Sequence, residues 1–200
     1  IAKEKGLEPL ALTIFDQGKS LPALDILAKE YINVEQNVET VEDALAGASD
    51  IIAELVADDA DIRRGLRELF MDKGELASMS TGDEDSVYSL YYTFSQLLPR
   101  IQGHQILALN RGEKEGFLKI SIHINKELAL KLIWKATIKS DSEASAFVKT
   151  ATEDSYDRLL FPSIERSIRS DLTDKAAEGA IRNFALNLKP LLMQPPVKDH

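Results

Sequence analysis

The sequence predicts a mainly α-helical fold with a small β insertion. Three observations support this fold class. Along most of the 200-residue chain, apolar residues recur at three- and four-residue spacings, the period of amphipathic helices. Residues that cap helix N-termini precede several of these stretches. The segment near 117–124 alternates strictly between apolar and polar residues, which indicates a half-buried strand.

The first part of the chain is predicted to be helical. Two short helices are expected over Pro9–Phe15 and Pro22–Ile32, the second with proline in its first turn. Thr40 and Asp43 have the spacing of a capping box and open a longer helix. Gly47 inside that helix predicts the close approach of another backbone, at a helix crossing. The apolar spacing predicts as its buried stripe Val41, Leu45, Ala48, Ile52 and Leu55.

A second long helix, a loop and an aromatic cluster follow. The helix, capped by Asp58 or Asp59, is expected to turn Ile62, Leu66, Leu69 and Phe70 inward. The polar stretch 75–86 lacks helical periodicity and predicts a loop. The aromatic residues of 88–94 suit either half-buried packing or base stacking, and we favour packing because no Lys or Arg lies among them. A helix is expected again from Pro99 to about Glu115.

The alternating segment needs a partner strand, because a lone strand leaves its backbone unpaired. Its apolar positions are Leu118, Ile120, Ile122 and Ile124. The residues near 134–139, in which Trp134, Ala136 and Ile138 alternate, are the nearest candidate partner, and a helix capped by Asn125 would connect the two strands.

The rest of the chain is predicted to be helical. Ser140 and Glu143 form a capping box for the next helix, and Pro162 kinks that helix or starts a new one. A final helix is expected from about Thr173 to the proline pair at 195–196. Its apolar side is Ala176, Ala177, Ala180, Ile181, Phe184, Leu188, Leu191 and Leu192.

Charge divides the chain into two predicted subdomains. The net charge is -9, but residues 1–100 contain 9 Lys and Arg against 20 Asp and Glu, whereas residues 101–200 contain 15 against 13. The run from Glu35 to Asp61 contains no basic residue, so that part of the surface would repel a polyphosphate. We therefore expect an acidic helical subdomain over 1–100 and a helical subdomain with the β element over 101–200.

Several function classes receive no support. The chain has no Cys, and its three His lack metal-ligand spacing, so neither a metal nor a cofactor is expected. Glycine-rich phosphate motifs and activated-nucleophile motifs are missing, so we expect no enzyme. Without a long apolar span or a signal peptide, a cytoplasmic protein with no membrane partner is expected.

Basic residues of the second half are the candidate contacts to RNA or DNA. Arg111 and Gly112 suit either a phosphate contact or a helix C-terminus followed by a turn. Clustering of the basic side chains on one exposed face would favour nucleic-acid binding, whereas salt bridges to Asp157 and Glu165 would favour a structural role. The candidates are Arg111, Lys114, Lys119, Arg158, Arg166 and Arg169.

The stretch His104–Glu113, HQILALNRGE, resembles the HRxLAxxRGE motif of the Tex family of bacterial transcription accessory proteins. Gln105 stands where that motif has arginine. Further segments resemble the family in the same order along the chain. These are GLEPLA at Gly6–Ala11, EDALAGASDIIAE at Glu42–Glu54, DRLLFPSIERSIR at Asp157–Arg169 and FALNLKPLLMQPPV at Phe184–Val197.

The resemblance implies a function for the longer protein of which this chain would be one region. Tex proteins are mainly helical and cytoplasmic, with an RNase H-like YqgF domain, helix-hairpin-helix motifs and an RNA-binding OB-fold. The chain is similar to the helical region before the YqgF domain, and its start at Ile1 agrees with a fragment. The expected function is a non-catalytic scaffold of a protein that binds RNA or DNA through other domains, with the transcription machinery as a further partner. The alternative is that this region itself contacts RNA or DNA.

Overall fold

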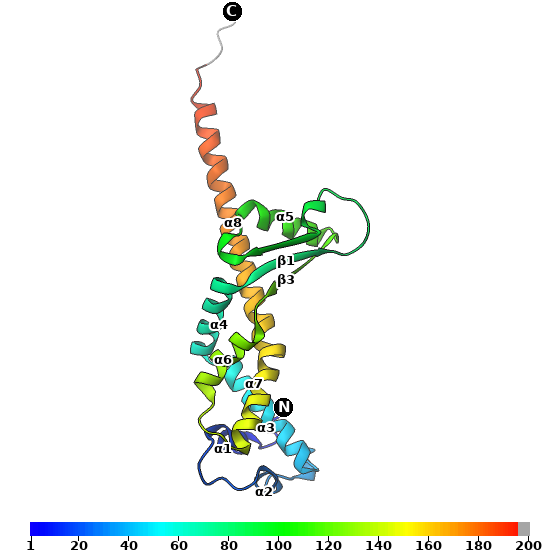
Figure 1. Ribbon diagram of the computed structural model, residues 1–200, viewed down its shortest axis with the longest axis vertical. Coiled ribbons are helices and arrows are strands. Elements are labelled where there is room, and N and C mark those ends of the chain that lie inside the picture. Colours follow the sequence, from blue (N-terminus) through cyan, green and yellow to red (C-terminus); the bar gives the residue numbers. More distant parts are fainter. Residues whose placement is uncertain (196–200) are drawn as a thin grey trace, which may run out of the picture. The chain divides into compact units, whose positions relative to one another are not determined.

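The computed structural model describes residues 1–195 and groups the chain into two compact units (Figure 1). Unit 1 combines Ile1–Leu69 with Asn125–Ile164, and unit 2 combines Phe70–Ile124 with Glu165–His200. Each unit contains two separate stretches of chain, so its bounds differ from the predicted subdomains 1–100 and 101–200. The fold class is the predicted one, mainly α with a small antiparallel sheet.

Unit 1 is helical, and its α3 packs against both α1 and α7. The apolar faces of these helices form a core that buries Leu10, Ile14, Ile51, Ile52 and Val148. The helices of this unit are α1 (Glu8–Asp16), α2 (Leu24–Lys29), α3 (Val41–Asp58), α6 (Lys126–Thr137) and α7 (Glu143–Ser155), with a 3₁₀ turn at Val34–Gln36. Helix α4 (Ala60–Lys73) begins in unit 1.

The start of α3 follows the prediction. The Asp43 amide donates to Thr40 Oγ1 at 3.1 Å, and the Thr40 amide donates to Asp43 Oδ2 at 3.2 Å, which confirms the capping box. The close neighbour of Gly47 is the Leu7 side chain rather than a second backbone, because a Cβ at residue 47 would overlap Leu7 Cδ1. The helix is covered by both α1 and α7, so its buried face is wider than the predicted stripe. It consists of Ala44, Ala48, Ile51, Ile52, Ala53, Val56 and Ala57, with Val41, Leu45 and Leu55 only half-buried.

The start of α7 differs from the prediction. Its N-cap is Ser142 and not Ser140, because the Ser145 amide donates to Ser142 Oγ at 3.3 Å while the Ser142 amide donates to Ser145 Oγ at 2.8 Å. A π-helical turn, Tyr156–Leu160, follows α7 and leads into α8 (Phe161–Leu192). Pro162 thus lies in the first turn of α8, where its missing N–H is tolerated, and the helix predicted from Thr173 begins at residue 161.

Unit 2 contains a three-stranded antiparallel sheet in the order β2-β1-β3. The strands are β1 (Glu75–Ser80), β2 (Thr93–Leu97) and β3 (Leu118–His123). In the register, Ala77 of the central strand lies opposite Ser95 of β2 and Ser121 of β3. Strand β3 confirms the strand predicted near 117–124.

Two predictions about this sheet are wrong. The stretch 75–86 is not all loop, because its first six residues form β1, the central strand. The predicted partner strand near 134–139 is instead the end of α6, which continues to Thr137. Strand β1 was not predicted because one of its buried positions is the polar residue Ser78. The Ser78 hydroxyl donates to the Tyr91 carbonyl at 2.5 Å.

Helix α5 (Gly103–Lys114) packs on the sheet next to β3. This layer buries Ile106 and Leu109 of the helix against the apolar face of the strand. The opposite face of β3 carries Lys119, Ser121 and His123. Two 3₁₀ turns, Ser89–Tyr91 and Leu98–Arg100, flank β2.

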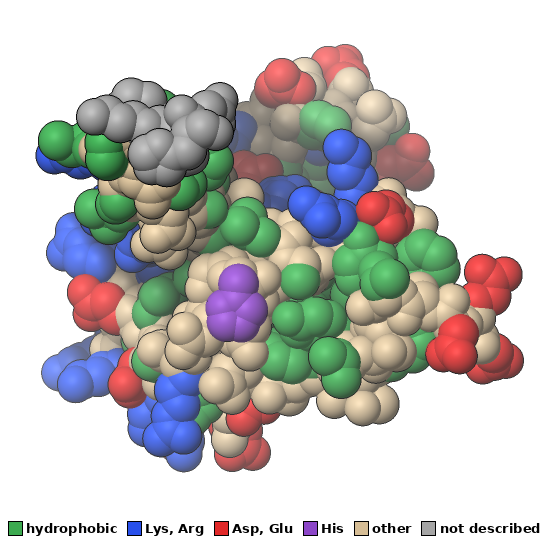
Figure 2. Space-filling view, turned by 90° about the horizontal axis from the view of Figure 1, so that it is seen from above, with side chains coloured by type: hydrophobic (Ala, Val, Ile, Leu, Met, Phe, Trp, Pro, Cys, Tyr) green, Lys and Arg blue, Asp and Glu red, His purple; other side chains and the backbone are tan. Residues whose placement is uncertain are grey.

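The last part of α8 presents its apolar side chains to solvent. Of the predicted apolar side, only Ala176 is buried, and from residue 181 to 195 every residue is exposed. Figure 2 shows hydrophobic side chains over this part of the helix. None of the helices in residues 1–195 combines the length and the hydropathy that a membrane span requires.

Candidate nucleic-acid interface

The motif on α5 and the segment that ends at Arg169 on α8 meet in one hydrogen-bonded cluster. The Arg169 guanidinium donates to Glu113 Oε1 at 3.0 Å and Oε2 at 2.6 Å, which is a bidentate pair. It also donates to Asn110 Oδ1 at 3.1 Å, while Asn110 Nδ2 donates to Thr173 Oγ1 at 2.8 Å. Three side chains of the resembling segments thus fasten α5 to α8.

Gly112, in the same motif, serves close packing. A Cβ at this residue would lie 2.5 Å from Leu118 Cδ1 and 3.2 Å from Tyr88 Cδ1. The helix continues for two residues beyond Gly112, so this glycine does not form the predicted turn. The left-handed turn residue is Gly116, with a φ of 86°.

Gln105, which departs from the family motif, has a local role at the start of α5. Its Oε1 accepts a hydrogen bond from the Gln102 amide at 2.9 Å. Gln102 is the N-cap of the helix, so this contact satisfies one backbone donor that the helix itself leaves unpaired.

Two of the six basic candidates are engaged in ion pairs. Arg169 is paired with Glu113 and is only 24% exposed. In unit 1, Arg158 Nη2 lies 2.9 Å from Asp154 Oδ2 and 3.8 Å from Asp50 Oδ1. The hydrogen bond to Asp154 raises the pKa of Arg158 above its already high usual value. The acidic partners differ from the predicted ones, Asp157 and Glu165.

The other four candidates belong to unit 2 and are exposed. Arg111 and Lys114 lie in the last turn of α5, Lys119 lies on the outer face of β3, and Arg166 lies on α8. Within residues 1–195 none of the four forms an ion pair. These side chains are the ones that remain available to a phosphate.

The aromatic cluster is used in packing. The buried Tyr88 ring lies 5.9 Å from the Phe117 ring, and the half-buried Tyr91 and Phe94 rings are 5.3 Å apart. Burial, together with the nearby Glu115 carboxylate, raises the pKa of Tyr88. Tyr92 donates its hydroxyl hydrogen to the Glu84 carbonyl at 2.5 Å. These contacts favour the packing interpretation over base stacking.

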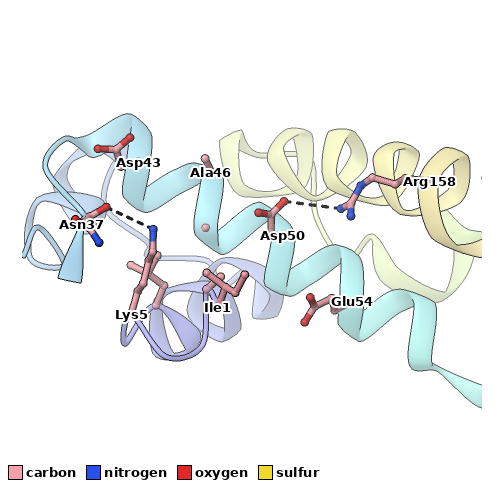
Figure 3. Close-up of a pocket in the computed structure, with 11 residues that line it drawn as sticks. Ile1, Lys5, Asn37, Asp43, Ala46, Asp50, Glu54 and Arg158 are labelled. Atoms are coloured by element: carbon pink, nitrogen blue, oxygen red, sulfur yellow. Dashed lines mark hydrogen bonds and ion pairs between the residues drawn. The ribbon is translucent and has the colours of Figure 1, made fainter.

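A cleft of about 390 Å³ in unit 1 has Arg158 on its wall (Figure 3). Lys5 Nζ donates to the Asn37 carbonyl at 3.5 Å, and Asp50 lies against Arg158. Asp43 is held by the capping box, and Glu54 adds a further carboxylate to the lining. Carboxylates outnumber the two basic side chains on these walls, so the cleft does not suit a phosphate.

In the described part of the chain, no group of three or more His, Cys, Asp or Glu side chains is placed to hold a metal ion.

The sequence analysis did not identify the partners of Arg169. Asn110 and Glu113 share one helix face at three-residue spacing, and this is the signal that points to them. Glu165, considered as a salt-bridge partner of the basic candidates, instead accepts a hydrogen bond at Oε2 from the Ile122 amide of β3 at 2.9 Å.

Comparison with protein families identifies the region. Residues 23–184 match the family model described as Tex central region-like. This match includes all six basic candidates and the cluster around Arg169.

Individual relatives agree with that match. The chain is 40% identical to the protein YdcI of Bacillus subtilis (strain 168), over 99% of this chain and 28% of the relative. It is 28% identical to the Transcriptional accessory protein Tex of Neisseria gonorrhoeae, over 98% of this chain and 27% of the relative. The human S1 RNA-binding domain-containing protein 1 is 26% identical, over 98% of this chain and 21% of the relative. The chain thus spans less than a third of the length of these relatives.

Proposed function

The chain belongs to the family defined by the Tex central region, and from this membership we propose that it is the non-catalytic helical scaffold of a cytoplasmic transcription accessory protein. That protein would bind RNA or DNA through domains outside residues 1–200. The name Transcriptional accessory protein Tex supports a transcription accessory protein, and the name S1 RNA-binding domain-containing protein 1 supports RNA binding by the full-length protein.

The scaffold role is supported mainly by the contacts of the motif residues, which are made within the chain itself. Asn110 and Glu113 are hydrogen-bonded to Arg169, and Gly112 packs against Leu118 and Tyr88. A motif whose polar side chains bind the side chains of a neighbouring helix holds the two helices in a fixed geometry. Such rigidity is what a protein needs in order to position domains attached to it.

The charge of the two units also favours a scaffold role over nucleic-acid binding. Unit 1 contains 13 Lys and Arg against 21 Asp and Glu, and unit 2 contains 11 against 12. Binding to a nucleic-acid backbone gains most of its free energy from counterions released by basic side chains. Neither unit has the excess of positive charge that this mechanism requires.

A titration of single-stranded RNA tests the proposal. A fluorescent oligouridine is titrated into this chain and into a full-length Tex protein at several salt concentrations. We expect tight binding by the full-length protein and weak binding by the chain, with a Kd above about 10 μM at about 150 mM salt. Sub-micromolar binding by the chain at that salt concentration would contradict the scaffold role.

A second function has its own observation: four of the six basic candidates, all in unit 2, are exposed and form no ion pair within residues 1–195. If they contact RNA or DNA directly, Arg111→Gln with Lys114→Gln would weaken binding by the chain and lower its salt dependence by about two counterions. Lys131→Gln with Lys135→Gln, two exposed lysines on α6 of unit 1, is the matched control. Equal affinities of the two double variants would exclude this second function.

A further inference from the structure

The end of α8 presents an apolar stripe to solvent. Its members are alternately four and three residues apart, which is the spacing of a helix face that packs along another apolar surface. Ile181, Phe184 and Leu191 are 69%, 67% and 62% exposed, and Leu188 is 37% exposed. The stripe consists of Ala177, Ile181, Phe184, Leu188 and Leu191. We call it the α8 stripe.

The α8 stripe faces away from the side of the helix that unit 2 covers. Because a helix turns by about 100° per residue, positions 181–191 of the stripe lie roughly opposite the buried Ile168. Every residue from 181 to 195 is exposed, so nothing in the described part of the chain covers this side. Figure 2 shows hydrophobic side chains at the surface over this part of the helix. A contiguous apolar face of this kind marks a surface that packs against something in the assembled protein.

A second copy of the chain is a poor occupant of this face. The stripe extends over only about two heptads, whereas coiled coils between separate chains usually need three or four. The flanking positions, which carry charge pairs in such coiled coils, include Ala180, Ala185 and Asn187, which are uncharged. The stripe therefore lacks both the length and the charge pattern of a face that joins two free chains.

The rest of the full-length polypeptide is a better occupant. The chain spans less than a third of the length of its relatives, so most of a polypeptide of that length lies outside it. A surface attached to α8 through the polypeptide itself meets the stripe at a high effective concentration. A short apolar stripe is then sufficient for stable packing.

We propose that the α8 stripe is the surface on which the scaffold holds the rest of the full-length polypeptide, through an apolar surface from outside residues 1–200. The bonds of Arg169 to Asn110 and Glu113 fix α8 to α5, so a surface packed on the stripe would keep a fixed position relative to unit 2. The inference rests on the proposed function, because it concerns how the scaffold positions the domains attached to it. It does not depend on which of those domains binds nucleic acid.

Hydrogen–deuterium exchange tests the proposal on the chain and on the full-length protein that contains it. In the chain, the amides of residues 181–192 should exchange rapidly, because this end of the helix lacks tertiary contacts among the described residues. In the full-length protein they should exchange at least about tenfold more slowly. The amides of β1, the central strand, are the internal reference and should exchange at the same rate in both proteins. Equal exchange of 181–192 in the two proteins would overturn the proposal.

Leu188→Gln and Leu186→Gln are a matched pair of variants. Both replace an exposed leucine of α8, but residue 188 belongs to the stripe and residue 186 lies on roughly the opposite side of the helix. In the chain, neither variant should shift the melting temperature by more than about 2 °C. In the full-length protein, only Leu188→Gln should accelerate exchange of 181–192, by at least about tenfold. Equal effects of the two variants there would refute the stripe.

Two other occupants would give different results. Sedimentation of the chain at about 100 μM should show a monomer, and a dimer that Leu188→Gln dissociates would overturn the proposal in favour of a second copy. Protection of 181–192 that appears only after addition of oligouridine would overturn it in favour of nucleic acid. Rapid exchange of 181–192 in the full-length protein, together with weak RNA binding by the chain, would refute the docking surface alone. Sub-micromolar RNA binding by the chain would contradict the scaffold role whatever the exchange rates are.

Discussion

Replacing Arg169 by glutamine tests the structural interpretation of the motif on α5. The substitution removes both hydrogen bonds to Glu113 and the bond to Asn110, at 3.0, 2.6 and 3.1 Å. It keeps a polar side chain at a position where α8 packs on α5. The change therefore reports the cluster itself rather than a cavity.

The expected loss follows from the burial of the pair. Hydrogen bonds to charged groups contribute about 1.5–3 kcal/mol each when their partners are well removed from water. Here the side chains of Arg169 and Glu113 are 24% and 38% exposed, so water solvates part of the Glu113 carboxylate once its partner is gone. We expect the free energy of unfolding of unit 2 to fall by about 2 kcal/mol.

Urea denaturation followed by circular dichroism measures this loss. The matched control is Arg166→Gln, at an earlier position on the same helix, which removes an exposed arginine without an ion pair among the described residues and should change stability by less than about 0.5 kcal/mol. Glu113→Gln completes a double-mutant cycle, with a coupling energy of about 1 kcal/mol or more expected. A loss for Arg169→Gln no larger than for the control, together with additive single and double variants, would refute the reasoning.

Two further predictions concern packing and pH. Gly112→Ala should destabilise the chain by about 1–3 kcal/mol, because its Cβ would lie 2.5 Å from Leu118 Cδ1. Gly179→Ala on α8 has no atom within 4 Å of the new Cβ and should stabilise it by up to about 1 kcal/mol, so thermal melting should show shifts of opposite sign. Hydrogen bonds to Asp157 and Glu153 raise the pKa of Lys126 above 10.5, so its stabilisation is complete below pH 10.5 and is lost as pH rises through the raised pKa. Unfolding of Lys126→Gln, followed by Trp134 fluorescence, should approach that of the parent chain above this pH, and a gap that widens there would count against the ion pair.

Local signals in the sequence were sufficient for much of the helical structure. The capping box of Thr40 and Asp43 starts α3 at the predicted residue, because both hydrogen bonds lie within four residues of chain. Ser140 and Glu143 have the same spacing, but the capping box of α7 forms between Ser142 and Ser145 instead. Two overlapping capping boxes are available in this stretch of sequence, and the structure uses the second.

The sheet shows why other elements could not be predicted. Strand β1 pairs with residues 93–97 on one side and 118–123 on the other, so its stability comes from partners distant in sequence. Its own side chains, with Ser78 buried, lack the apolar alternation that identifies a strand. The alternating residues near 134–139 cause the opposite error, because they predict a strand where the structure has the end of α6. In α6 the buried residues Leu130, Ile133 and Thr137 follow the helical period, which outweighs the short alternation.

The basic residues of the candidate site could be predicted from the sequence, but their ion pairs could not. The basic residues were identified from the charge of the second half of the chain. Their division into paired and unpaired sets depends on tertiary contacts, since Arg169 meets Glu113 across 56 positions of sequence and Arg158 meets Asp50 of α3. No local pattern specifies such pairs.

Helix geometry now separates the two possible roles of the α5 motif. Asn110 and Glu113, three residues apart, face α8, whereas Arg111 and Lys114, also three residues apart, are exposed to solvent. Stability therefore depends on Asn110 and Glu113, whereas a direct contact to nucleic acid would depend on Arg111 and Lys114. Charge reversal by Arg111→Glu with Lys114→Glu should leave the free energy of unfolding within about 0.5 kcal/mol of the parent chain. Weaker RNA binding by that variant of the full-length protein would then support a contribution of the two side chains to the RNA-binding surface, and an unchanged affinity would refute it.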